Sequence, residues 1–354
     1  MRKLSVLFVL FCCSCALFAQ NQPTPPAPPA APQAEFKPGG SAIGTIFFNY
    51  GYDFTDDVET RSSFSLDRAY LGYKYNFSQN LNARVIFDVG YSNGAFTAFA
   101  KNAFIEWGVA PYLKLTAGLI PIKHFELQEK AWGYRYITKP SADMHGFGTT
   151  ADLGINAELP LNEHLTINLY AINGEGFKKL QDLGGNHKFG INATVKPREG
   201  LSFRVHYDIM PYEVDTSSIS VFSAFAGYEK PELFRVGVEY NLLHNGSSYS
   251  TPAEEYQKYN VSAYGTYIIN PAFEVFARYD WVSSNKLNQG DDRTWNFKQD
   301  GSFIMAGAQY RPVRNVNFSL NYRTFLYGNS DEDFWPDGNV TSTQGVFLSM
   351  GISW

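Results

Sequence analysis

The chain has 354 residues, of which 44% are apolar, 16% are aromatic and 18% are charged, and its formal net charge is −5. This acidic balance argues against a nucleic-acid partner, which requires a basic stripe on the protein surface. After residue 19, no apolar run reaches the roughly 18 residues that a membrane-spanning helix needs. If this part of the chain crosses a membrane, it therefore crosses as strands.

The segment 1–19 is typical of a secretory signal peptide. Two basic residues precede an apolar run over residues 4–17, and Ala19 is a small residue after which cleavage is expected. All three cysteines of the chain lie inside this segment, so the mature protein is predicted to contain none. A lipoprotein signal at Cys15 is the alternative, although Cys12 stands where such a signal carries Leu or Val.

The segment 20–40 is rich in Pro and Ala and cannot form a packed core. It is predicted to be a semi-rigid periplasmic linker, and a role in holding the cell wall or a periplasmic partner is the alternative. The composition changes after this segment. Residues 41–354 are predicted to form one domain.

One pattern, the alternation of apolar and polar residues, recurs through residues 41–354. From Leu201 to Ile209 every second residue is apolar, and the residues between them are Ser, Arg, His and Asp. A period of two indicates strands with one apolar and one polar face. Sixteen strands are predicted, and they begin near Ala42, Phe64, Leu81, Ala98, Leu113, Ala151, Leu165, His187, Leu201, Ile219, Phe234, Tyr256, Phe273, Gly301, Val316 and Gln344.

The connections between these strands alternate in length. Short turns such as Ser78–Asn80 and Arg311–Asn315 alternate with long polar loops such as Phe54–Ser62, His244–Glu255 and Leu326–Thr343. Short turns on one side and long loops on the other are typical of a membrane β-barrel, with periplasmic turns and extracellular loops.

Tyr and Trp residues lie near the strand ends in two outward rows, one at each expected membrane interface, where amphipathic rings are stable. The rows are Tyr52, Tyr91, Tyr207, Tyr240, Trp281 and Tyr322 on one side, and Tyr75, Trp107, Tyr228, Tyr267, Tyr310 and Trp354 on the other. These features together predict an all-β fold, a transmembrane antiparallel β-barrel of about 16 strands.

The last ten residues, Gly345–Trp354, alternate apolar and small residues and end on an aromatic residue. They resemble the C-terminal assembly signal of bacterial outer-membrane proteins, whose closing strand ends in the periplasmic interface. The resemblance implies recognition by the barrel-assembly machinery and a location in the outer membrane of a Gram-negative bacterium. An ordinary edge strand is the alternative.

A barrel of this size is too wide for side chains to fill, so its lumen is expected to hold water. The inward faces agree, because they carry many charged residues that would be prohibitive in a dry core. The residues expected to line the pore or its constriction are Arg68, Arg84, Lys114, Lys123, Lys130, Arg135, Arg204, Arg235, Arg278, Arg323, Asp88, Glu106, Asp208 and Glu239.

Three upward strands share one arrangement, in which a carboxylate follows an arginine by four residues on the inward face: Arg84 and Asp88, Arg204 and Asp208, and Arg235 and Glu239. Strand rise and barrel tilt put each carboxylate roughly 10 Å nearer the outer mouth. Two interpretations are open. The arginines form a belt beneath a more acidic belt, or these residues pair with neighbouring strands and stiffen the wall.

The longest connection, Pro121–Thr150, is the third loop on the outer side. A connection of about thirty residues suggests function or disorder, and its aromatic residues argue against disorder. Its charges, which include Lys123, Lys130 and Arg135, suit a loop that folds into the lumen and narrows it. A surface lid is the alternative.

Several short motifs, taken in their order and spacing, resemble the phosphate-selective porin O/P family. They are Asp67–Gly72 (DRAYLG), Gly118–Pro121, Trp132–Tyr136 (WGYRY), Ala151–Gly154 (ADLG) and Asn173–Gly176 (NGEG). The match covers about residues 64–207 and continues to Trp354 by strand pattern only.

This resemblance implies a sixteen-stranded porin that forms homotrimers, in which inward Arg and Lys residues and an inward third loop attract anions. Arg68 and Arg135 lie in motifs similar to those of the family, and Lys123 closely follows one of them. The chain departs from the pattern of a strongly anion-selective porin in one respect, because its inward faces also carry many carboxylates.

An outer-membrane enzyme is the main alternative from another class, and an adhesive barrel is a second. Neither a G-x-S-x-G nor an H-E-x-x-H motif occurs, and the six histidines show no metal-ligand spacing. The acidic clusters Asp331–Asp333 and Asp291–Asp292 could bridge divalent ions to lipopolysaccharide, or could simply be solvated. We therefore predict a protein that is not an enzyme.

Taken together, these features predict an outer-membrane porin that admits small hydrophilic solutes by passive diffusion and prefers anions such as phosphate. A general, non-selective porin is the alternative. The expected partners are outer-membrane lipid and lipopolysaccharide, the barrel-assembly machinery, small solutes or anions, and further copies of the chain in a homotrimer. No cofactor, metal ion or nucleic acid is expected.

Overall fold

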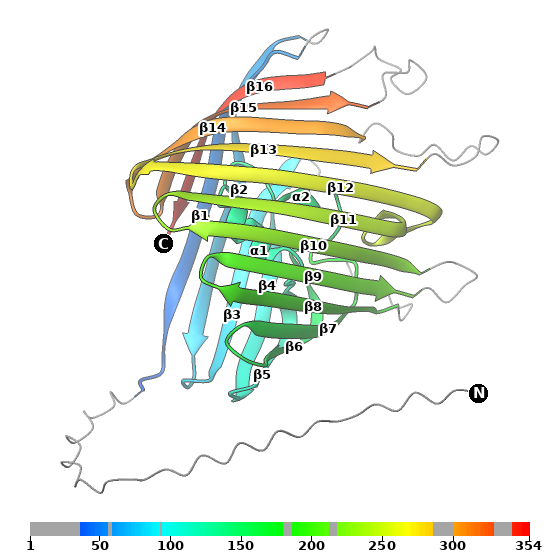
Figure 1. Cartoon of the computed structure of the whole chain (residues 1–354). Helices are drawn as coiled ribbons and strands as arrows, with labels where there is room; N and C mark the ends of the chain where they lie inside the picture. Colours follow the sequence, from blue (N-terminus) through cyan, green and yellow to red (C-terminus); the bar gives the residue numbers. More distant parts are fainter. Residues whose placement is uncertain are drawn as a thin grey trace, which may run out of the picture. The chain divides into compact units, whose positions relative to one another are not determined.

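The structure, a computed structural model, describes residues 36–55, 59–92, 94–179, 186–211, 218–285, 300–328 and 342–354. The chain divides into two units, Met1–Phe36 and Lys37–Trp354, and the second contains all of the described helices and strands (Figure 1). The predicted signal peptide, most of the predicted linker and the two acidic clusters lie outside the described residues.

Sixteen antiparallel strands of the described chain form a closed barrel in which each strand pairs with its neighbours in sequence (Figure 1). They are β1 Gly39–Asp53, β2 Arg61–Asn76, β3 Leu81–Ser92, β4 Ala95–Ala110, β5 Leu113–Pro121, β6 Ala151–Pro160, β7 Leu165–Ile172, β8 Lys188–Arg198, β9 Leu201–Met210, β10 Ile219–Lys230, β11 Phe234–Ser248, β12 Thr251–Asn270, β13 Phe273–Ser284, β14 Gly301–Val313, β15 Val316–Tyr327 and β16 Ser342–Ser353. The predicted fold class is confirmed, and most strands begin at or within three residues of the predicted position.

The barrel closes where the last strand meets the first. β16 pairs with β1 from Thr45–Ser353 to Asp53–Gly345, and the backbones of Gly44 and Trp354 exchange two hydrogen bonds of 3.2 and 3.0 Å. The Trp354 ring lies over Gly44, where a Cβ atom would come within 2.0 Å of the ring. Pairing of the terminal strands satisfies backbone groups that lipid could not satisfy.

The alternation in the sequence becomes an apolar outer face and a polar inner face. On β9, Phe203, Val205 and Tyr207 expose 40%, 50% and 42% of their surface, whereas Arg204 and Asp208 are buried. This is the inverse of a water-soluble protein, in which apolar side chains gain about 25 cal/mol for each Å² removed from water. Lipid solvates such an outer face in a membrane.

The hairpin of β11 and β12 differs from the prediction of a long loop over His244–Glu255. β11 continues to Ser248 and β12 begins at Thr251, so a turn of two residues separates them. The ladder shifts its register on both sides of Gly246. The hairpin therefore extends beyond the part of the strands that alternates apolar and polar residues. In this extension the backbone still pairs, but the irregular ladder has no regular alternation of side chains.

Two strands have irregular alternation for identifiable reasons. In β4, Lys101 is an extra residue in the ladder with β3, and such a β-bulge re-aims the side chain, which here lines a cavity inside the barrel. In β10, Val221 and Phe225 lie on the inner face and are buried. β10 thus has apolar residues on both faces, because its inner face packs against other parts of the protein.

The connection between β5 and β6, residues 122–150, is the third connection on the side opposite the short turns such as Ser78–Asn80, and it is called L3 below. It contains two short helices, α1 Glu126–Trp132 and α2 Ser141–Met144. α1 ends at Gly133, which has the left-handed conformation (φ 76°) that favours glycine. Neither helix in the described part of the chain has the length and apolar character required to cross a membrane.

Candidate functional site

The middle of L3 packs against the inner face of the barrel through aromatic rings. Trp132 and Tyr134 are buried, and their ring centroids lie 5.6 Å from Tyr264 of β12 and 4.0 Å from Phe276 of β13, respectively. Burying an aromatic side chain of this size contributes roughly 3 kcal/mol. This part of L3 is therefore fixed to the wall and not exposed at the mouth.

A buried ion pair on β13 holds the second half of L3. Arg278 donates hydrogen bonds of 2.8 and 2.5 Å to Asp280, and both side chains are fully buried. Arg278 also donates to the carbonyl oxygen of Lys139 at 2.6 Å, and Nε2 of His145 lies 3.1 Å from Asp280. Removing one member would leave a buried charge without compensation, so the network depends on every partner.

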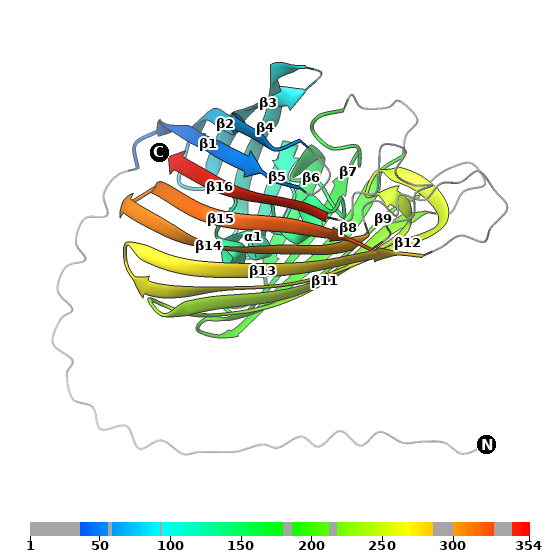
Figure 2. The same ribbon diagram turned by 90° about the horizontal axis from the view of Figure 1, so that it is seen from above.

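The first residues of L3 are held by β8, β9 and β10. Arg204 and Asn192 both donate hydrogen bonds to the carbonyl oxygen of Lys123, at 2.6 and 2.8 Å. The next residue, His124, is buried, and its Nε2 lies 2.7 Å from the hydroxyl oxygen of Ser223. Tyr136 of L3 also donates a hydrogen bond of 2.7 Å to Gln309 of β14. Together with the contacts above, these bonds place L3 against the inner wall from β8 to β14. Figures 1 and 2 both show α1 within the ring of strands.

His124 belongs to a cluster with metal-ligating side chains. Its ring stacks on His206 of β9, with centroids 3.9 Å apart and planes 9° apart, and the ligand atoms of both histidines and of Asp208 lie within 4.8 Å of one another. Stacked rings direct their nitrogen lone pairs along parallel planes, whereas a tetrahedral metal site needs lone pairs that converge. The arrangement therefore suits packing better than metal binding.

The histidine of L3 in this cluster is uncharged at neutral pH. Burial lowers the pKa of His124 well below its ordinary value, and the neighbouring His206, Arg204 and Lys188 lower the pKa further. An uncharged imidazole can stack closely on a second imidazole. Its Nε2 can either accept a hydrogen bond from the Ser223 hydroxyl or donate one to it.

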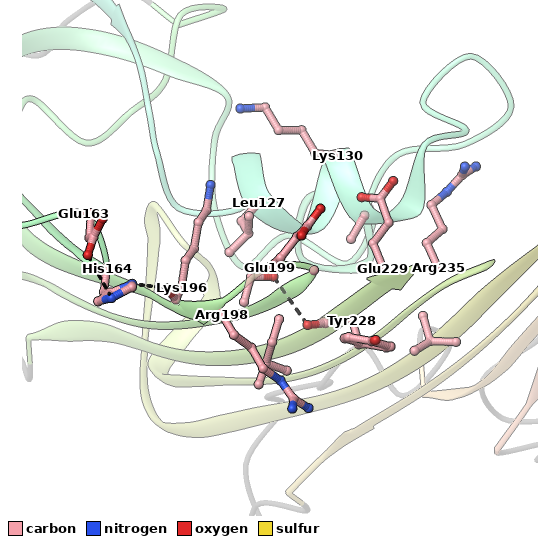
Figure 3. A pocket seen from close by; sticks show the side chains of 16 residues that line it. Leu127, Lys130, Glu163, His164, Lys196, Arg198, Glu199, Tyr228, Glu229 and Arg235 are labelled. Carbon is pink, nitrogen blue, oxygen red and sulfur yellow. Dashed lines mark hydrogen bonds and ion pairs between the residues drawn. The ribbon is translucent and has the colours of Figure 1, made fainter. Parts of the chain in front are cut away.

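Cavities open on both sides of L3. The end of the barrel that carries the short turns is called the turn end below, and the first group of cavities lies there. A cavity of about 470 Å³ lies beside α1, with Lys130, Lys196 and Arg235 among its lining residues (Figure 3). A second cavity of about 370 Å³ shares Lys130 and Lys196 with it. The charged residues of the second cavity are Lys114, Lys123, Lys130, Lys196, Arg204, Glu126, Glu158 and Glu163.

Glu126 of α1 joins two cations of the turn-end cavity. Nζ of Lys123 and Nζ of Lys130 each lie 2.8 Å from its carboxylate. Burial raises the pKa of Glu126, but the two lysines outweigh this effect and lower the pKa to about 2. Glu126 is therefore ionised at neutral pH, and it orients both ammonium groups along the cavity wall.

The second group of cavities lies at the opposite end, called the loop end, on the side of β2 to β4. One cavity has a volume of about 300 Å³, and its charged lining residues are Arg68, Lys101, Arg135, Lys139, Lys178, Lys179, Asp88, Asp143 and Glu175. It shares Arg68, Arg135 and Lys139 with a cavity of about 630 Å³ that extends to Phe64 and Phe96.

Comparisons with known proteins agree with this architecture. Residues 192–346 match a family model described as an outer membrane protein beta-barrel domain. OmpF of Salmonella typhi, solved in complex with daunomycin, is 13% identical and superposes with a TM-score of 0.64 over 89% of this chain and 97% of its own. The barrel has the porin fold.

Other porin-like structures are similar to the same extent. The outer membrane channel DcaP of Acinetobacter baumannii is 12% identical, with a TM-score of 0.62 over 90% of this chain and 97% of its own. An anion-selective porin from Comamonas acidovorans is 11% identical, with a TM-score of 0.61 over 90% of this chain and 100% of its own. No curated protein sequence matches the chain.

These findings place the chain among outer-membrane β-barrels of the Gram-negative type. A porin fold also agrees with the prediction that the protein is not an enzyme. Identities of 11–13% establish the fold alone, so the narrower resemblance to the phosphate-selective porin O/P family stays a prediction.

Eight of the predicted pore residues line the four cavities of this porin barrel. Three of them line the loop-end cavities: Arg68, Asp88 and Arg135. The other five line the turn-end cavities: Lys114, Lys123, Lys130, Arg204 and Arg235. These eight residues come from five different strands and from L3. Their distances in the sequence do not indicate that they gather at two places in the barrel.

Six predicted pore residues do not line these four cavities: Arg84, Arg278, Arg323, Glu106, Asp208 and Glu239. Arg278, Asp208 and Glu239 lie on inner faces but expose only 2%, 3% and 3% of their surface, because L3 occupies the space in front of these strands. The other three contact neighbouring strands: Arg84 lies over the Phe104 ring, Glu106 accepts from Asn82, and Arg323 donates to Ser349.

Lys101 and Lys178 are among the cavity-lining cations that are absent from the predicted set. Lys101 enters the lumen through the β-bulge of β4, and its Nζ lies 4.0 Å from the centre of the Tyr70 ring. Lys178 follows β7 in a loop, and its Nζ lies 4.9 Å from the centre of the Phe99 ring. The break in the alternation of β4 is a signal that could have located Lys101, whereas no local signal exists for Lys178.

Proposed function

We propose that this protein is an outer-membrane porin through which small hydrophilic solutes, and preferentially anions, diffuse passively. Water inside the barrel provides the route, L3 narrows it, and the charges on the two sides of L3 set the ion preference. The turn end faces the periplasm and the loop end faces the exterior, the usual orientation of such barrels.

The distribution of charge around L3 carries the proposal. The loop-end cavity of 300 Å³ has six Lys and Arg side chains against three carboxylates, and the turn-end cavity of 370 Å³ has five against three. Asp208, Glu239 and Asp280 are instead buried between L3 and the wall. Many lumen carboxylates are thus withdrawn from a passing solute, and the remaining positive excess raises the local concentration of anions.

The contacts favour pairing between strands over separate belts of arginines and carboxylates. Asp88 pairs with Arg68 on the neighbouring β2 at 3.3 Å, and Asp208 pairs with Lys188 on the neighbouring β8 at 3.6 Å. In neither case is the partner the arginine four residues earlier in the same strand. We therefore assign the anion preference to the cations that line the cavities.

Phosphate is the anion we propose, because the motifs around Arg68 and Arg135 resemble those of the phosphate-selective porin O/P family. We also propose a homotrimer in contact with lipopolysaccharide. The structurally similar OmpT of Vibrio cholerae, with a TM-score of 0.57, has been solved in a trimer form. The alternation of β16 and the aromatic residue that follows it, Trp354, support recognition by the barrel-assembly machinery.

The test is the zero-current potential of the purified protein in a planar bilayer under a KCl gradient, followed by addition of phosphate. Anion preference with a current that falls when phosphate is added supports a phosphate porin. Anion preference without this fall supports a general anion porin. Weak or cation preference contradicts the proposed selectivity, and the absence of conductance contradicts the porin itself.

A further inference from the structure

The barrel wall is interrupted at its loop end between β2 and β3. The ladder of these strands runs from Asn76–Asn82 to Ala69–Val89 and ends there. Beyond this point, residues 61–68 pair with β1 alone and residues 90–92 pair with β4 alone. The end of the β3–β4 hairpin stands apart from β1 and β2 in Figure 2. These two unpaired strand edges bound a gap in the wall, called the notch below.

The cavity of about 630 Å³ lies at the notch and joins the lumen to the outer face of the barrel. Arg135 and Lys139 of L3 line it on the inside, and Phe64, Tyr91 and Phe96 line it on the outside. These three rings expose 72%, 69% and 62% of their surface. The cavity therefore opens sideways, toward the surroundings of the barrel, as well as into the lumen.

The notch lies at the depth of the outer membrane interface. Tyr52, a member of the predicted outer aromatic row, pairs with Ser62 of β2. Phe64 follows Ser62 by two residues in the direction of the membrane, and Tyr91 belongs to the same row as Tyr52. At this depth, unpaired backbone groups need a polar partner, because contact with hydrocarbon leaves them without hydrogen bonds. The outward rings of the notch, by contrast, face lipid. An occupant that satisfies both is polar on one side and apolar on the other.

The charges of the cavity define the polar side of this occupant. Arg68, Arg135 and Lys139 line the cavity against one carboxylate, Asp67. The side chain of Lys139 keeps 40% of its surface exposed, and its ammonium group pairs with Asp143 at 3.1 Å. A partly exposed pair of this kind contributes little stability, so an anionic ligand can compete with Asp143 for the ammonium group. A small hydrophilic anion would use these cations but not the rings, and a neutral lipid chain would use the rings but not the cations.

We propose that the notch binds an amphipathic anion, a single hydrocarbon chain that ends in a carboxylate or a phosphate and enters sideways from the outer leaflet. The anionic group contacts Arg135 and Lys139, and the chain lies along Phe64 and Phe96. Such binding goes beyond passive diffusion through the lumen, because the ligand arrives from the membrane and not from the aqueous mouth.

The experiment uses the purified full-length protein in liposomes with a palmitate analogue that carries a photoreactive diazirine on its chain. After illumination, mass spectrometry of peptides locates the labelled residues. We expect the label to concentrate on residues 61–68 and 90–97 and to be displaced by excess dodecanoate or dodecyl phosphate. Comparison of the two competitors identifies the anionic group. Dodecanol and inorganic phosphate are expected to displace little.

Matched variants separate the notch from the rest of the lipid-facing surface. Phe64→Ala with Phe96→Ala is expected to lower the labelling of the notch about five-fold, as the loss of roughly 1 kcal/mol of apolar contact predicts. Phe87→Ala removes an equally lipid-facing ring, 48% exposed, and is expected to leave the labelling unchanged. Retention of the barrel is checked for each variant by its heat-modifiable migration in gels.

Three outcomes would overturn the proposal. Labelling spread evenly over the outward side chains would show that the notch has no preference for the probe. Displacement by dodecanol as strong as by dodecanoate would show that the cations take no part. Absence of label from residues 61–68 and 90–97, with labelling elsewhere on the outer face, would show that the notch does not bind the probe.

Discussion

At the scale of single residues, Lys101 and Lys178 place two positive charges in the loop-end cavity. Replacing both with Gln is expected to lower the anion-to-cation permeability ratio about three-fold, because the remaining charges attract fewer anions. The zero-current potential under a KCl gradient measures this ratio. Lys230→Gln removes the same kind of charge at an exposed strand end and serves as the control, and an equal fall in this variant would contradict the assignment.

Asp280 is a second residue whose contribution can be measured. It compensates the buried charge of Arg278, and this ion pair holds L3 to the wall. Asp280→Asn is expected to weaken the attachment of L3 by about 3 kcal/mol, the typical cost of an uncompensated buried charge. Hydrogen exchange in peptides over residues 133–145 is expected to accelerate about a hundred-fold. Asp143→Asn breaks the more exposed pair with Lys139 and should change the exchange little. Unchanged exchange in Asp280→Asn would show that the pair does not hold L3.

At the scale of elements, the attachment of L3 depends on pH through His124. The pKa of this residue lies well below the ordinary value of 6.5, so the attached loop favours the neutral ring. The stabilisation is complete above pH 6.5 and declines as the pH falls, by at most about 1.4 kcal/mol per pH unit for one proton. The groups that face the ring are His206, Asp208 and Arg204 of β9, with Lys188 of β8 and Ser223 of β10.

The expected result is greater noise in the open-channel current below about pH 5, as L3 begins to detach. His124→Phe keeps a flat ring that can stack on His206 but cannot take up a proton, so its current noise should depend less on pH. The quantity to compare is the variance of the single-channel current between pH 7 and pH 4. Equal pH dependence in both proteins would exclude His124 as the group responsible.

The elements also show which parts of the structure a sequence reveals. A strand with lipid on one side and polar surroundings on the other alternates apolar and polar residues. In β9 and β13 this alternation predicts both the strand and the side chains that face inward. The alternation does not predict the environment of a side chain where L3 covers the wall. Val221 and Phe225 of β10 lie on the inner face as apolar residues, and Arg278 becomes buried although it faces inward. Which wall L3 covers depends on contacts between residues more than 100 positions apart, such as Trp132 with Tyr264.

At the scale of the whole molecule, L3 divides the interior of the barrel unequally. It lies against the inner wall from β8 to β14 through aromatic rings, a buried ion pair and hydrogen bonds. The loop-end cavities lie on the opposite side, where Arg68 of β2 and Lys101 of β4 face Arg135 of L3. The open side of the channel is therefore the cationic side, and the carboxylates of β9, β11 and β13 are on the covered side.

The central claim, that solutes pass on the side of β2 to β4, is tested most directly by cysteine accessibility during conductance. Single cysteines at Lys101 and at Ser262, which is fully buried on β12, are introduced into the chain, whose mature form is predicted to contain no other cysteine. Each channel is then exposed to a small anionic methanethiosulfonate reagent. We predict rapid modification of Lys101→Cys with a fall in current and no modification of Ser262→Cys. Equally fast modification of Ser262→Cys would contradict the account, because it would place the open route behind L3.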